Sequence, residues 1–259
     1  MPDENMLQLR LRIAARPATV YPFFTVSERF SRWMGQGSSI APNAGGDLRV
    51  AYPNGDVASG RVVQLLPEQR IAFTWGYEGG AHGIAAGSTR VLIALAEVSG
   101  DTLLTLRHDG FPTEELKRNH AVGWRTALAL LANMAAREQF DAAGLAAVEA
   151  YLRAWNQHDA AQRAVDLAAC WDDTGSYRDH LSYVEGREDF NDHIGAAQAL
   201  APNVKIEIAG LIQQCQGALR FPFRVRGDGG LVFATGACFA HLTPEGRIRS
   251  MVSFLDGVL

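Results

Sequence analysis

The sequence predicts two α+β domains in series, and three observations lead to this fold class. The chain has 259 residues, whereas single domains usually have about 100–150 residues. Its first half reads as a strand, two short helices, five strands and a long helix. Its second half reads as two helices, a strand, a helix and four strands, so the order differs and no internal repeat links the halves. We therefore expect one domain over residues 1–140 and a second over residues 141–259.

The first half predicts an antiparallel sheet. Leu7, Leu9 and Leu11 alternate with polar residues, which is the period of a half-buried strand. Two short helical segments follow from Pro17, and Gly35 ends the second of them. Five short strands are then expected between residues 45 and 108, separated by the turn sequences NG, GG and SGD. Strands joined in series by tight turns pair in the antiparallel direction.

A long helix closes the first half. Thr113 is a good N-cap, and Glu114 and Glu115 occupy the first turn, where the helix dipole favours anions. One apolar stripe runs along the helix at a spacing of three to four residues, and it consists of Leu116, His120, Trp124, Ala127 and Leu131. This face must lie on the sheet, so we expect a curved sheet that grips a helix. The pattern fades towards Gly144, near the expected domain boundary.

The second half predicts a cone-shaped α+β barrel, in which helices close one face of a bent sheet. A helical stripe ends at Trp155, and Asp159 can cap the next helix. A short strand through residues 175–183 leads to a third helix, which Pro202 ends. Four strands are expected over residues 204–256.

The composition and motifs exclude several classes of protein. The net charge of −4 provides no basic field for a nucleic-acid partner. The three cysteines, Cys170, Cys215 and Cys238, lack the spacing of a disulfide framework or a thiolate zinc site. The motifs HExxH, GxxxxGKS/T and GxSxG are absent from the sequence, so we expect no catalytic metal, no nucleotide phosphate site and no cofactor.

The N-terminal sequence starts acidic and then alternates, so it lacks the basic and apolar regions of a signal peptide. Elsewhere the sequence has no apolar run that approaches the roughly 18–20 residues of a spanning helix. We therefore expect a cytoplasmic protein without membrane insertion.

Several short motifs occur together in the first half, over residues 6–136. They are "ERFSRWM", Gly45, Gly46, Gly60, "LP" with "RIAFTW" between Leu66 and Trp75, and "HAVGW" from His120 to Trp124. With these motifs the first half resembles the START-like helix-grip superfamily, in the branch named for activators of the heat-shock-protein-90 ATPase. This resemblance implies an apolar cavity between the sheet and the long helix, for a small lipid-like or aromatic molecule. It does not imply chaperone activity.

The candidate ligand-binding residues of this cavity are Trp33, Trp75, His108, His120 and Trp124. His108 lies on the inward face of its predicted strand, and His120 and Trp124 lie on the apolar stripe of the helix. Two inward histidines can contact a polar group of a ligand, but the alternative is that both are hydrogen-bonded core residues. The aromatic face that includes Trp75 either lines a cavity or fills it as core.

The second half contains a further set of spaced residues and motifs, namely Tyr151, Asp159, Asp173, Asp179, "GREDF" from Gly186, "PFRV" from Pro222 and "GRI" from Gly246. With these residues it resembles the SnoaL-like and ketosteroid-isomerase-like group of the nuclear-transport-factor cone fold. The resemblance puts the family's phenolic oxyanion donor at Tyr151 and its general base at Asp179. The family's third group, a protonated carboxylic acid, falls on Cys238. It implies a cofactor-independent isomerase or cyclase that acts on an apolar small molecule, and a homodimer through this domain.

The implied reaction is proton transfer next to a ketone. It needs a base that takes a proton from carbon and neutral donors that stabilise the enolate oxygen. Tyr151 supplies one donor, but Cys238 offers only a weak S–H group. Loss of one such donor typically costs on the order of 10²–10³ in rate. A non-catalytic ligand-binding or sensing protein is therefore the alternative, and a co-chaperone-like interaction protein is a third reading.

The structural role of each candidate stays open at the level of sequence. In a continuous strand Tyr177, Asp179 and Leu181 share one face, so Asp179 should accompany an aromatic wall. The alternative is a strand-end carboxylate that faces water. Tyr151 and Cys238 can each also be ordinary core residues. The further candidate ligand-binding residues of this half are Trp155, Tyr177 and His241, the last being one strand face away from Cys238.

Overall fold

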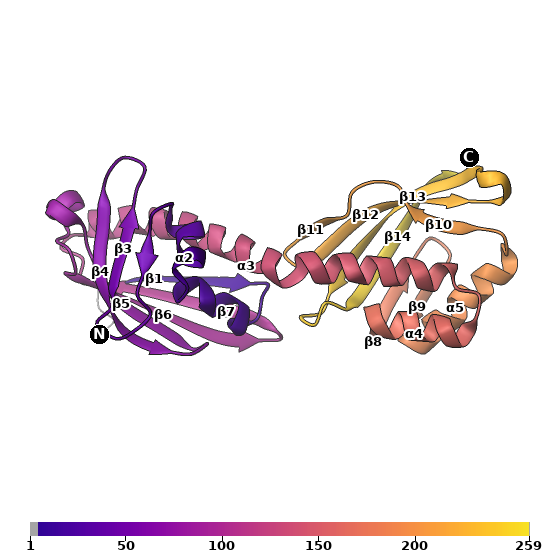
Figure 1. The fold of residues 1–259 in the computed structure, drawn as a ribbon, viewed down its shortest axis with the longest axis horizontal. Coiled ribbons are helices and arrows are strands. Elements are labelled where there is room, and N and C mark those ends of the chain that lie inside the picture. The colour runs from indigo at the N-terminus through magenta and orange to yellow at the C-terminus, as the bar shows by residue number, and fades with distance from the viewer. Residues whose placement is uncertain (1–4, 259) are drawn as a thin grey trace. The chain divides into compact units, whose positions relative to one another are not determined.

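The computed structural model of the chain describes residues 5–258 (Figure 1). The chain divides into two compact units between Ala136 and Arg137, called the first and the second unit below. The sequence pattern placed the boundary after residue 140. The predicted α+β class is confirmed, because each unit combines one large sheet with helices.

The first unit is built on a seven-stranded antiparallel sheet in the order β1-β7-β6-β5-β4-β3-β2. Strand β1 buries Leu7, Leu9 and Ile13 on one face and pairs with β7 over its whole length, as its alternating pattern predicts. The predicted meander is present as β3–β7, whereas β2 and η2 were not predicted. The elements before the long helix are β1 (Leu7–Ile13), α1 (Pro17–Val20), η1 (Tyr21–Phe24), α2 (Ser27–Met34), β2 (Ser39–Ile40), β3 (Asp47–Ala51), β4 (Val57–Leu66), β5 (Arg70–Trp75), η2 (Glu78–Gly83), β6 (Thr89–Val98) and β7 (Asp101–Asp109).

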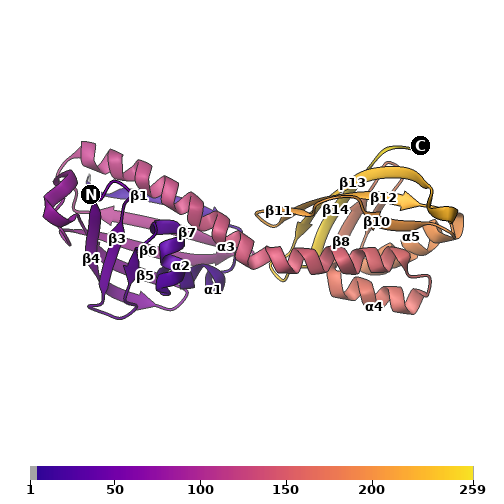
Figure 2. The ribbon, with the colours of Figure 1, turned by 45° about the horizontal axis from the view of Figure 1, so that its top comes forward.

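Helix α3 (Glu114–Asn156) contributes residues to both units. Its first part runs across the sheet of the first unit (Figure 2) and buries Trp124 and Leu131 in the same core as the inward residues of β6 and β7. Although α3 has 43 residues, neither it nor any other helix within residues 5–258 combines the length and apolar character that a membrane span requires.

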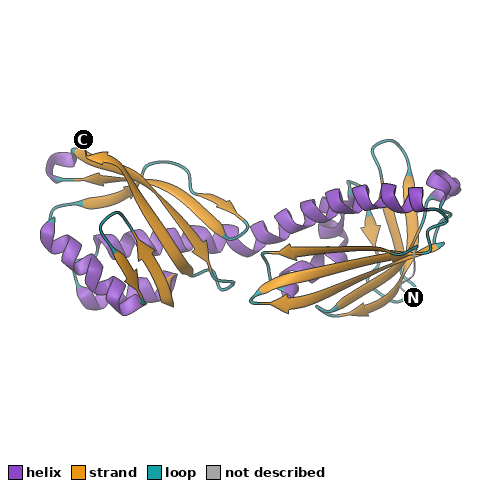
Figure 3. Cartoon of the chain, turned by 180° about the vertical axis from the view of Figure 1, so that it is seen from behind, coloured by secondary structure: helices purple, strands orange, loops and turns teal. Residues whose placement is uncertain are grey.

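The second unit also contains a seven-stranded sheet, in the order β10-β12-β13-β14-β8-β9, with β11 paired to β12. Figure 3 shows the strands of both units in orange. Strands β14 and β8 pair in parallel. The first of the four late strands that the sequence predicted is divided into β10 and β11, which pair with different stretches of β12. The elements after α3 are α4 (Ala160–Cys170), β8 (Trp171–Arg178), β9 (Tyr183–Glu185), α5 (Arg187–Leu200), β10 (Lys205–Ile208), β11 (Gln213–Cys215), β12 (Ala218–Arg226), η3 (Asp228–Gly230), β13 (Val232–Leu242) and β14 (Ile248–Val258).

The apolar pattern of the sequence fades towards Gly144, near the expected domain boundary, but α3 runs through that residue. A side chain at Gly144 would come within 2.9 Å of Leu219 Cδ2 on β12. The glycine therefore permits a close approach between helix and sheet, and it does not end the helix.

Both predicted N-caps are present. The Thr113 hydroxyl accepts a hydrogen bond from the Leu116 N–H at 3.2 Å, at the start of α3. The Asp159 carboxylate accepts one from the Gln162 N–H at 2.8 Å, at the start of α4. Each cap satisfies an N–H group that has no partner within the helix.

A buried arginine, which the sequence pattern did not reveal, joins α4 to α5. Arg163 Nε donates to the Asn191 side chain at 2.8 Å, and Arg163 Nη1 donates to Gln198 Oε1 at 3.0 Å. These bonds fix α5, whose Phe190 ring stacks on Tyr177 of β8 at 4.9 Å between centroids. The helix thereby holds one wall of the site described next.

Candidate functional site

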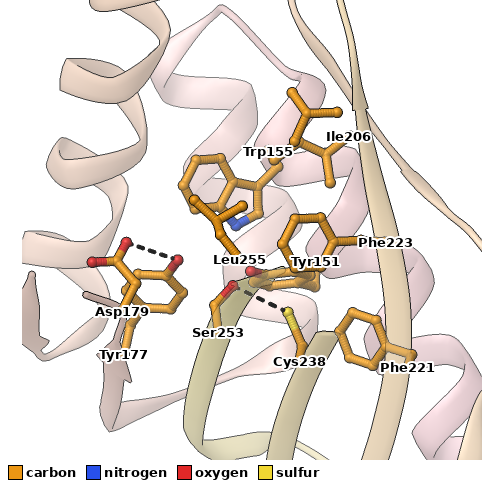
Figure 4. A pocket seen from close by; sticks show the side chains of 11 residues that line it. Tyr151, Trp155, Tyr177, Asp179, Ile206, Phe221, Phe223, Cys238, Ser253 and Leu255 are labelled. Atoms are coloured by element: carbon orange, nitrogen blue, oxygen red, sulfur yellow. Dashed lines mark hydrogen bonds between the residues drawn. The ribbon is translucent and has the colours of Figure 1, made fainter. Parts of the chain in front are cut away.

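A cavity of about 130 Å³, called the second-unit cavity, lies between the second part of α3 and the curved sheet (Figure 4). The three residues proposed for catalysis, Tyr151, Asp179 and Cys238, all line it. The ligand-binding candidates Trp155 and Tyr177 line it as well. The other lining residues are Ile206, Phe221, Phe223, Val225, Ser253 and Leu255. The walls are therefore mainly apolar, with a few polar groups that converge.

Asp179 is half-buried at the end of β8, and its carboxylate is held by three hydrogen bonds. Oδ1 accepts from the backbone N–H groups of Leu181 at 2.8 Å and Ser182 at 2.7 Å. Oδ2 accepts from the Tyr177 hydroxyl at 3.2 Å (Figure 4). The carboxylate thus lines the cavity instead of pointing only to water, and its position is fixed by backbone donors and by a phenol.

The predicted strand does not continue past Asp179. Strand β8 ends at Arg178, and Leu181 is 83% exposed in the turn that the Asp179 side chain closes. The expectation that Leu181 shares the inward face is therefore wrong. Aspartate side chains that accept backbone N–H groups two residues on stabilise turns in this way.

Tyr177 and Tyr151 are buried phenols. Burial raises the pKa of Tyr177, and the negative charge of Asp179 raises it further. Burial also raises the pKa of Tyr151 well above its usual range, with a smaller contribution from the neighbouring Cys238. The Tyr151 ring lies nearly parallel to those of Trp171 and Phe190, with ring centroids 6.2 and 6.3 Å away. Both phenols therefore remain protonated donors near neutral pH.

Cys238 is a buried thiol that donates to a serine. Its Sγ lies 3.6 Å from Ser253 Oγ (Figure 4), and burial raises its pKa to about 11. The thiol is therefore neutral, and its proton is directed to Ser253, so the hydroxyl proton of Ser253 is available to another acceptor. Sequence reasoning missed Ser253. Ser253 follows buried Met251 on the inward face of β14. A polar residue on an inward strand face was the signal in the sequence that could have identified Ser253 as a candidate.

His193 is a second residue that sequence reasoning missed. It lies on α5 with its ring centroid 5.4 Å from that of Tyr177 and 6.2 Å from that of Trp155. Burial lowers its pKa, and the charge of Asp179 opposes this effect. His193 is not itself a lining residue, but its ring contacts with Tyr177 and Trp155 support the aromatic wall of the cavity.

His241 lies away from the cavity, so the expectation that it binds a ligand there is corrected. It is exposed on β13, where Cys238 and Ala240 point inward and Phe239 and His241 point outward. Residues three apart on a strand lie on opposite faces, which is why Cys238 and His241 cannot face the same cavity.

The first unit contains a larger cavity of about 490 Å³, called the first-unit cavity, between the start of α3 and the sheet. Three of the predicted residues, Trp75, His120 and Trp124, line it. The lining residues that were not predicted are Met34, Tyr52, Tyr77, His82, Leu116, Asn119, Gly123 and Ala127. The aromatic face of β5 therefore serves both purposes that the sequence left open, because its continuation at Tyr77 lines the cavity and Phe73 belongs to the core.

Trp33 and His108 are core residues, so the expectation that they bind a ligand is corrected. Trp33 is buried and its Nε1 donates to the Phe23 carbonyl at 2.9 Å. His108 accepts from Trp124 Nε1 at its Nδ1, 3.0 Å away, and its Nε2 lies 2.8 Å from Thr89 Oγ1. A neutral imidazole satisfies both contacts, and burial lowers the pKa of His108 to about 3.

Within the described part of the chain, three or more His, Cys, Asp or Glu side chains are nowhere grouped as they would be to hold a metal ion. The chemistry available at the second-unit cavity is that of one carboxylate, two phenols, a thiol and a hydroxyl. These groups can move a proton and can donate hydrogen bonds to an oxygen that gains charge.

Comparisons with known proteins relate the chain to two families. Residues 14–136 match the family model "Activator of Hsp90 ATPase homolog 1-like protein". A proposed isomerase of the SnoaL-like family from Agrobacterium tumefaciens is 31% identical, over 45% of this chain and 99% of that chain, with a TM-score of 0.43. An AHSA1-like protein from Rhizobium etli is 31% identical, over 52% of this chain and 84% of that chain, with a TM-score of 0.41. The comparison with curated proteins found no match.

Proposed function

This chain joins a region of the AHSA1-like family to a region of the SnoaL-like family, and from that premise we propose that its second-unit cavity catalyses proton transfer next to a ketone. Asp179 is the base and Tyr151 is an oxyanion donor. The observation that carries the proposal is that both residues line one apolar cavity, together with Cys238 and Ser253.

The reaction proceeds in two proton transfers. Asp179 takes a proton from the carbon next to the carbonyl group, and the electrons of that C–H bond move to the carbonyl oxygen as an enolate forms. Tyr151 donates a hydrogen bond to that oxygen. The protonated Asp179 then returns the proton to another carbon of the same conjugated system, which shifts the double bond. In a cyclase, the enolate carbon instead attacks a second carbonyl of the substrate, and Asp179 returns its proton to the new alkoxide.

Ser253 completes the oxyanion site in this proposal. Cys238 stands where the family's carboxylic acid is expected, and a thiol is a weak donor. Because Cys238 donates to Ser253, the serine hydroxyl can turn its own proton to the substrate oxygen. The buried Ser253 thus offers the second donor that the sequence pattern lacked.

The size of the second-unit cavity limits the substrate. Cavities that enclose a drug-sized ligand usually measure about 300–1,000 Å³, whereas this one measures about 130 Å³. The cavity therefore suits the reacting ring of a substrate, whose remaining part extends past the half-buried Asp179.

The test uses a small ketone that fits this volume. Conversion of 3-cyclohexen-1-one to the conjugated 2-cyclohexen-1-one is followed by ultraviolet absorbance. Asp179→Asn should lower kcat by about 10²–10⁴-fold, because the amide cannot accept the proton. Asp173→Asn on the same strand is the matched control, since Asp173 is exposed and paired with Arg187. Full activity of Asp179→Asn would refute the assignment of the base.

A non-catalytic ligand-binding protein is the second candidate function, and Cys238 at the position of the acid favours it. Native mass spectrometry of the purified chain tests this candidate. A small molecule that is recovered unchanged, together with failure of the wild type to convert the ketone, would favour binding over catalysis.

We also propose that two copies pair through the outer face of the second unit's sheet. Phe239 and Phe254 are 43% and 55% exposed there, with ring centroids 6.0 Å apart. Light scattering should give the mass of a dimer for the wild type and of a monomer for Phe239→Lys/Phe254→Lys. A monomeric wild type would contradict the proposal.

A further inference from the structure

We propose that the first-unit cavity binds a neutral aromatic ketone, whose carbonyl oxygen lies at the hydroxyl and N–H groups of Tyr52 and Trp75. The cavity measures about 490 Å³, which is within the usual range of about 300–1,000 Å³ for small-molecule sites. This inference concerns a different cavity from the proposed catalytic one and stands independently of it.

The walls of the cavity favour a flat aromatic ring. The rings of Trp75 and Trp124 lie 5.3 Å apart, and Tyr77 meets Trp75 edge-to-face at 6.3 Å. Trp124 cannot turn freely, because its Nε1 is bonded to His108 and His108 contacts Thr89. The buried His108 network thus presents a fixed aromatic surface to the cavity, and such surfaces bind aromatic rings by offset or edge-to-face contacts.

The main reason to expect a hydrogen-bond acceptor on the ligand is Trp75. Its side chain is only 2% exposed and lines the cavity, yet its Nε1 has no hydrogen-bond partner within the described residues. Burial raises the pKa of the Tyr77 phenol, and the nearby Trp75 N–H opposes this effect, although its geometry is not that of a hydrogen bond. Buried N–H groups are nearly always paired, so an unpaired one beside a cavity indicates a missing acceptor.

The neighbouring polar groups leave Tyr52 as the second donor. His120 Nδ1 donates to the Leu116 carbonyl at 2.8 Å, so a neutral His120 has Nε2 free to accept from the Tyr77 hydroxyl at 3.4 Å. The Tyr77 proton is therefore already used. The Tyr52 ring lies beside Tyr77, with centroids 6.2 Å apart. Burial raises the pKa of the Tyr52 phenol, and its interaction with the Tyr77 hydroxyl raises it further, so before a ligand binds the Tyr52 proton is directed to Tyr77, and it turns to the ligand on binding. Tyr52 thus remains a protonated donor.

The electrostatics of the cavity favour an uncharged acceptor. Burial lowers the pKa of His120, so the imidazole inside the cavity is neutral near pH 7. At the rim, His82 is paired with Asp56 at 2.7 Å, so its ring nitrogen already has a partner. Moving a carboxylate from water into such a site is costly without a cation to pair with it, whereas a ketone oxygen needs only donors.

Gly123 marks the entrance. It lies in the N-terminal part of α3, lines the cavity and is exposed, and a side chain there would meet nothing within 4 Å. Glycine is unfavourable inside a helix, so its presence in a gap of the helical wall is consistent with passage of a ligand. The exposed His82 and Asn119 form the rest of the rim.

Calorimetric titration of the full chain tests the proposal with three probes. 1-Tetralone and tetralin share one bicyclic frame and differ by a carbonyl in place of a methylene group, and 1-naphthoate is the anionic comparison. 1-Tetralone should bind at least about tenfold more tightly than tetralin, and more tightly than 1-naphthoate. Equal affinities of 1-tetralone and tetralin, tighter binding of 1-naphthoate, or no binding of 1-tetralone would overturn the proposal.

Three variants locate the site. Tyr52→Phe should weaken 1-tetralone by about tenfold and leave tetralin unchanged, because only the hydroxyl is lost. Gly123→Leu should weaken both by filling the entrance, whereas Val122→Leu, next to it on the exposed face, should change neither. Circular dichroism melting checks that each variant folds. Asp179→Asn should bind 1-tetralone like the wild type, so failure of the catalytic proposal would not affect this result. Unchanged binding in folded Gly123→Leu would place the site elsewhere and overturn the assignment.

Discussion

The hydroxyl of Tyr177 donates a hydrogen bond to the carboxylate of Asp179 at 3.2 Å, and the two residues are only two positions apart on the chain. Tyr177 lies near the end of β8 and Asp179 follows directly after the strand, so the end of the strand brings both side chains to the same cavity. Burial has the larger effect on the pKa of the Tyr177 phenol and raises it, and the carboxylate of Asp179 raises it further. The pair therefore consists of a fixed acceptor and a donor that does not ionise near neutral pH.

The first prediction concerns the ionisation of Tyr177. Asp179→Asn removes the negative charge beside the phenol, so the pKa of Tyr177 should fall towards the value that burial alone sets. Tyrosinate should then appear at lower pH in the variant than in the wild type, as measured by near-ultraviolet absorbance during alkaline titration. Asp173→Asn should titrate like the wild type. Superimposable curves for Asp179→Asn and the wild type would show that the pair is not formed in solution.

A second prediction concerns stability at acidic pH. The pKa of His108 is lowered from 6.5 to about 3 in the folded chain, so between these values the unfolded chain binds a proton that the folded chain does not. Stability is therefore fully present above pH 6.5 and is lost as the pH falls, by ~1.4 kcal/mol per pH unit. Between pH 6.5 and pH 5, His108 alone should cost about 2 kcal/mol of unfolding free energy.

Urea unfolding at several pH values measures this loss. His108→Gln keeps one donor and one acceptor for Thr89 and Trp124 but cannot be protonated, so its stability should fall less between pH 6.5 and pH 5. His241→Gln is the matched control, because His241 is exposed. An equal loss in His108→Gln and in the wild type would mean that His108 is not the group responsible.

Much of the fold could be predicted from local patterns. The alternation in β1 and the caps at Thr113 and Asp159 depend on the chemistry of neighbouring residues, and the structure contains all three. The continuation of α3 through Gly144 could not be predicted, because it depends on packing against Leu219, which is distant in sequence. Tertiary contacts of this kind override the helix propensity of a single residue.

The same limit applies to the candidate sites. Alternation correctly placed His108 on an inward face, but it could not reveal that Thr89 and Trp124 occupy both ring nitrogens. It also extended the strand past Asp179, because the turn there is closed by the side chain of Asp179 itself. Ser253 gains its proposed role only from its contact with the thiol of Cys238 on the adjacent strand. Inward faces were therefore predictable, and hydrogen-bond partners across the fold were not.

A third prediction compares two glycines of α3. Alanine is favoured over glycine in a helix by about 1 kcal/mol, and a side chain at Gly123 would meet nothing within 4 Å. Gly123→Ala should therefore raise the unfolding free energy by about 0.5–1 kcal/mol. Gly144→Ala should give no such gain, because its Cβ would lie 2.9 Å from the buried Leu219. Thermal and urea melts of both variants check this, and a stabilised Gly144→Ala would contradict the packing role of that residue.

The last prediction distinguishes the role of Ser253 from that of Cys238 in the second-unit cavity. If Ser253 is the second oxyanion donor, Ser253→Ala should lower kcat for 3-cyclohexen-1-one by about 10²–10³-fold with little change in KM, because the donor acts mainly on the charged transition state. Cys238→Ala removes the thiol but leaves the serine proton free to reach the substrate, so its loss should be much smaller. Tyr151→Phe should resemble Ser253→Ala. If Cys238→Ala shows the loss expected of Ser253→Ala and Ser253→Ala does not, while both variants melt like the wild type, the thiol and not the hydroxyl supplies the second donor.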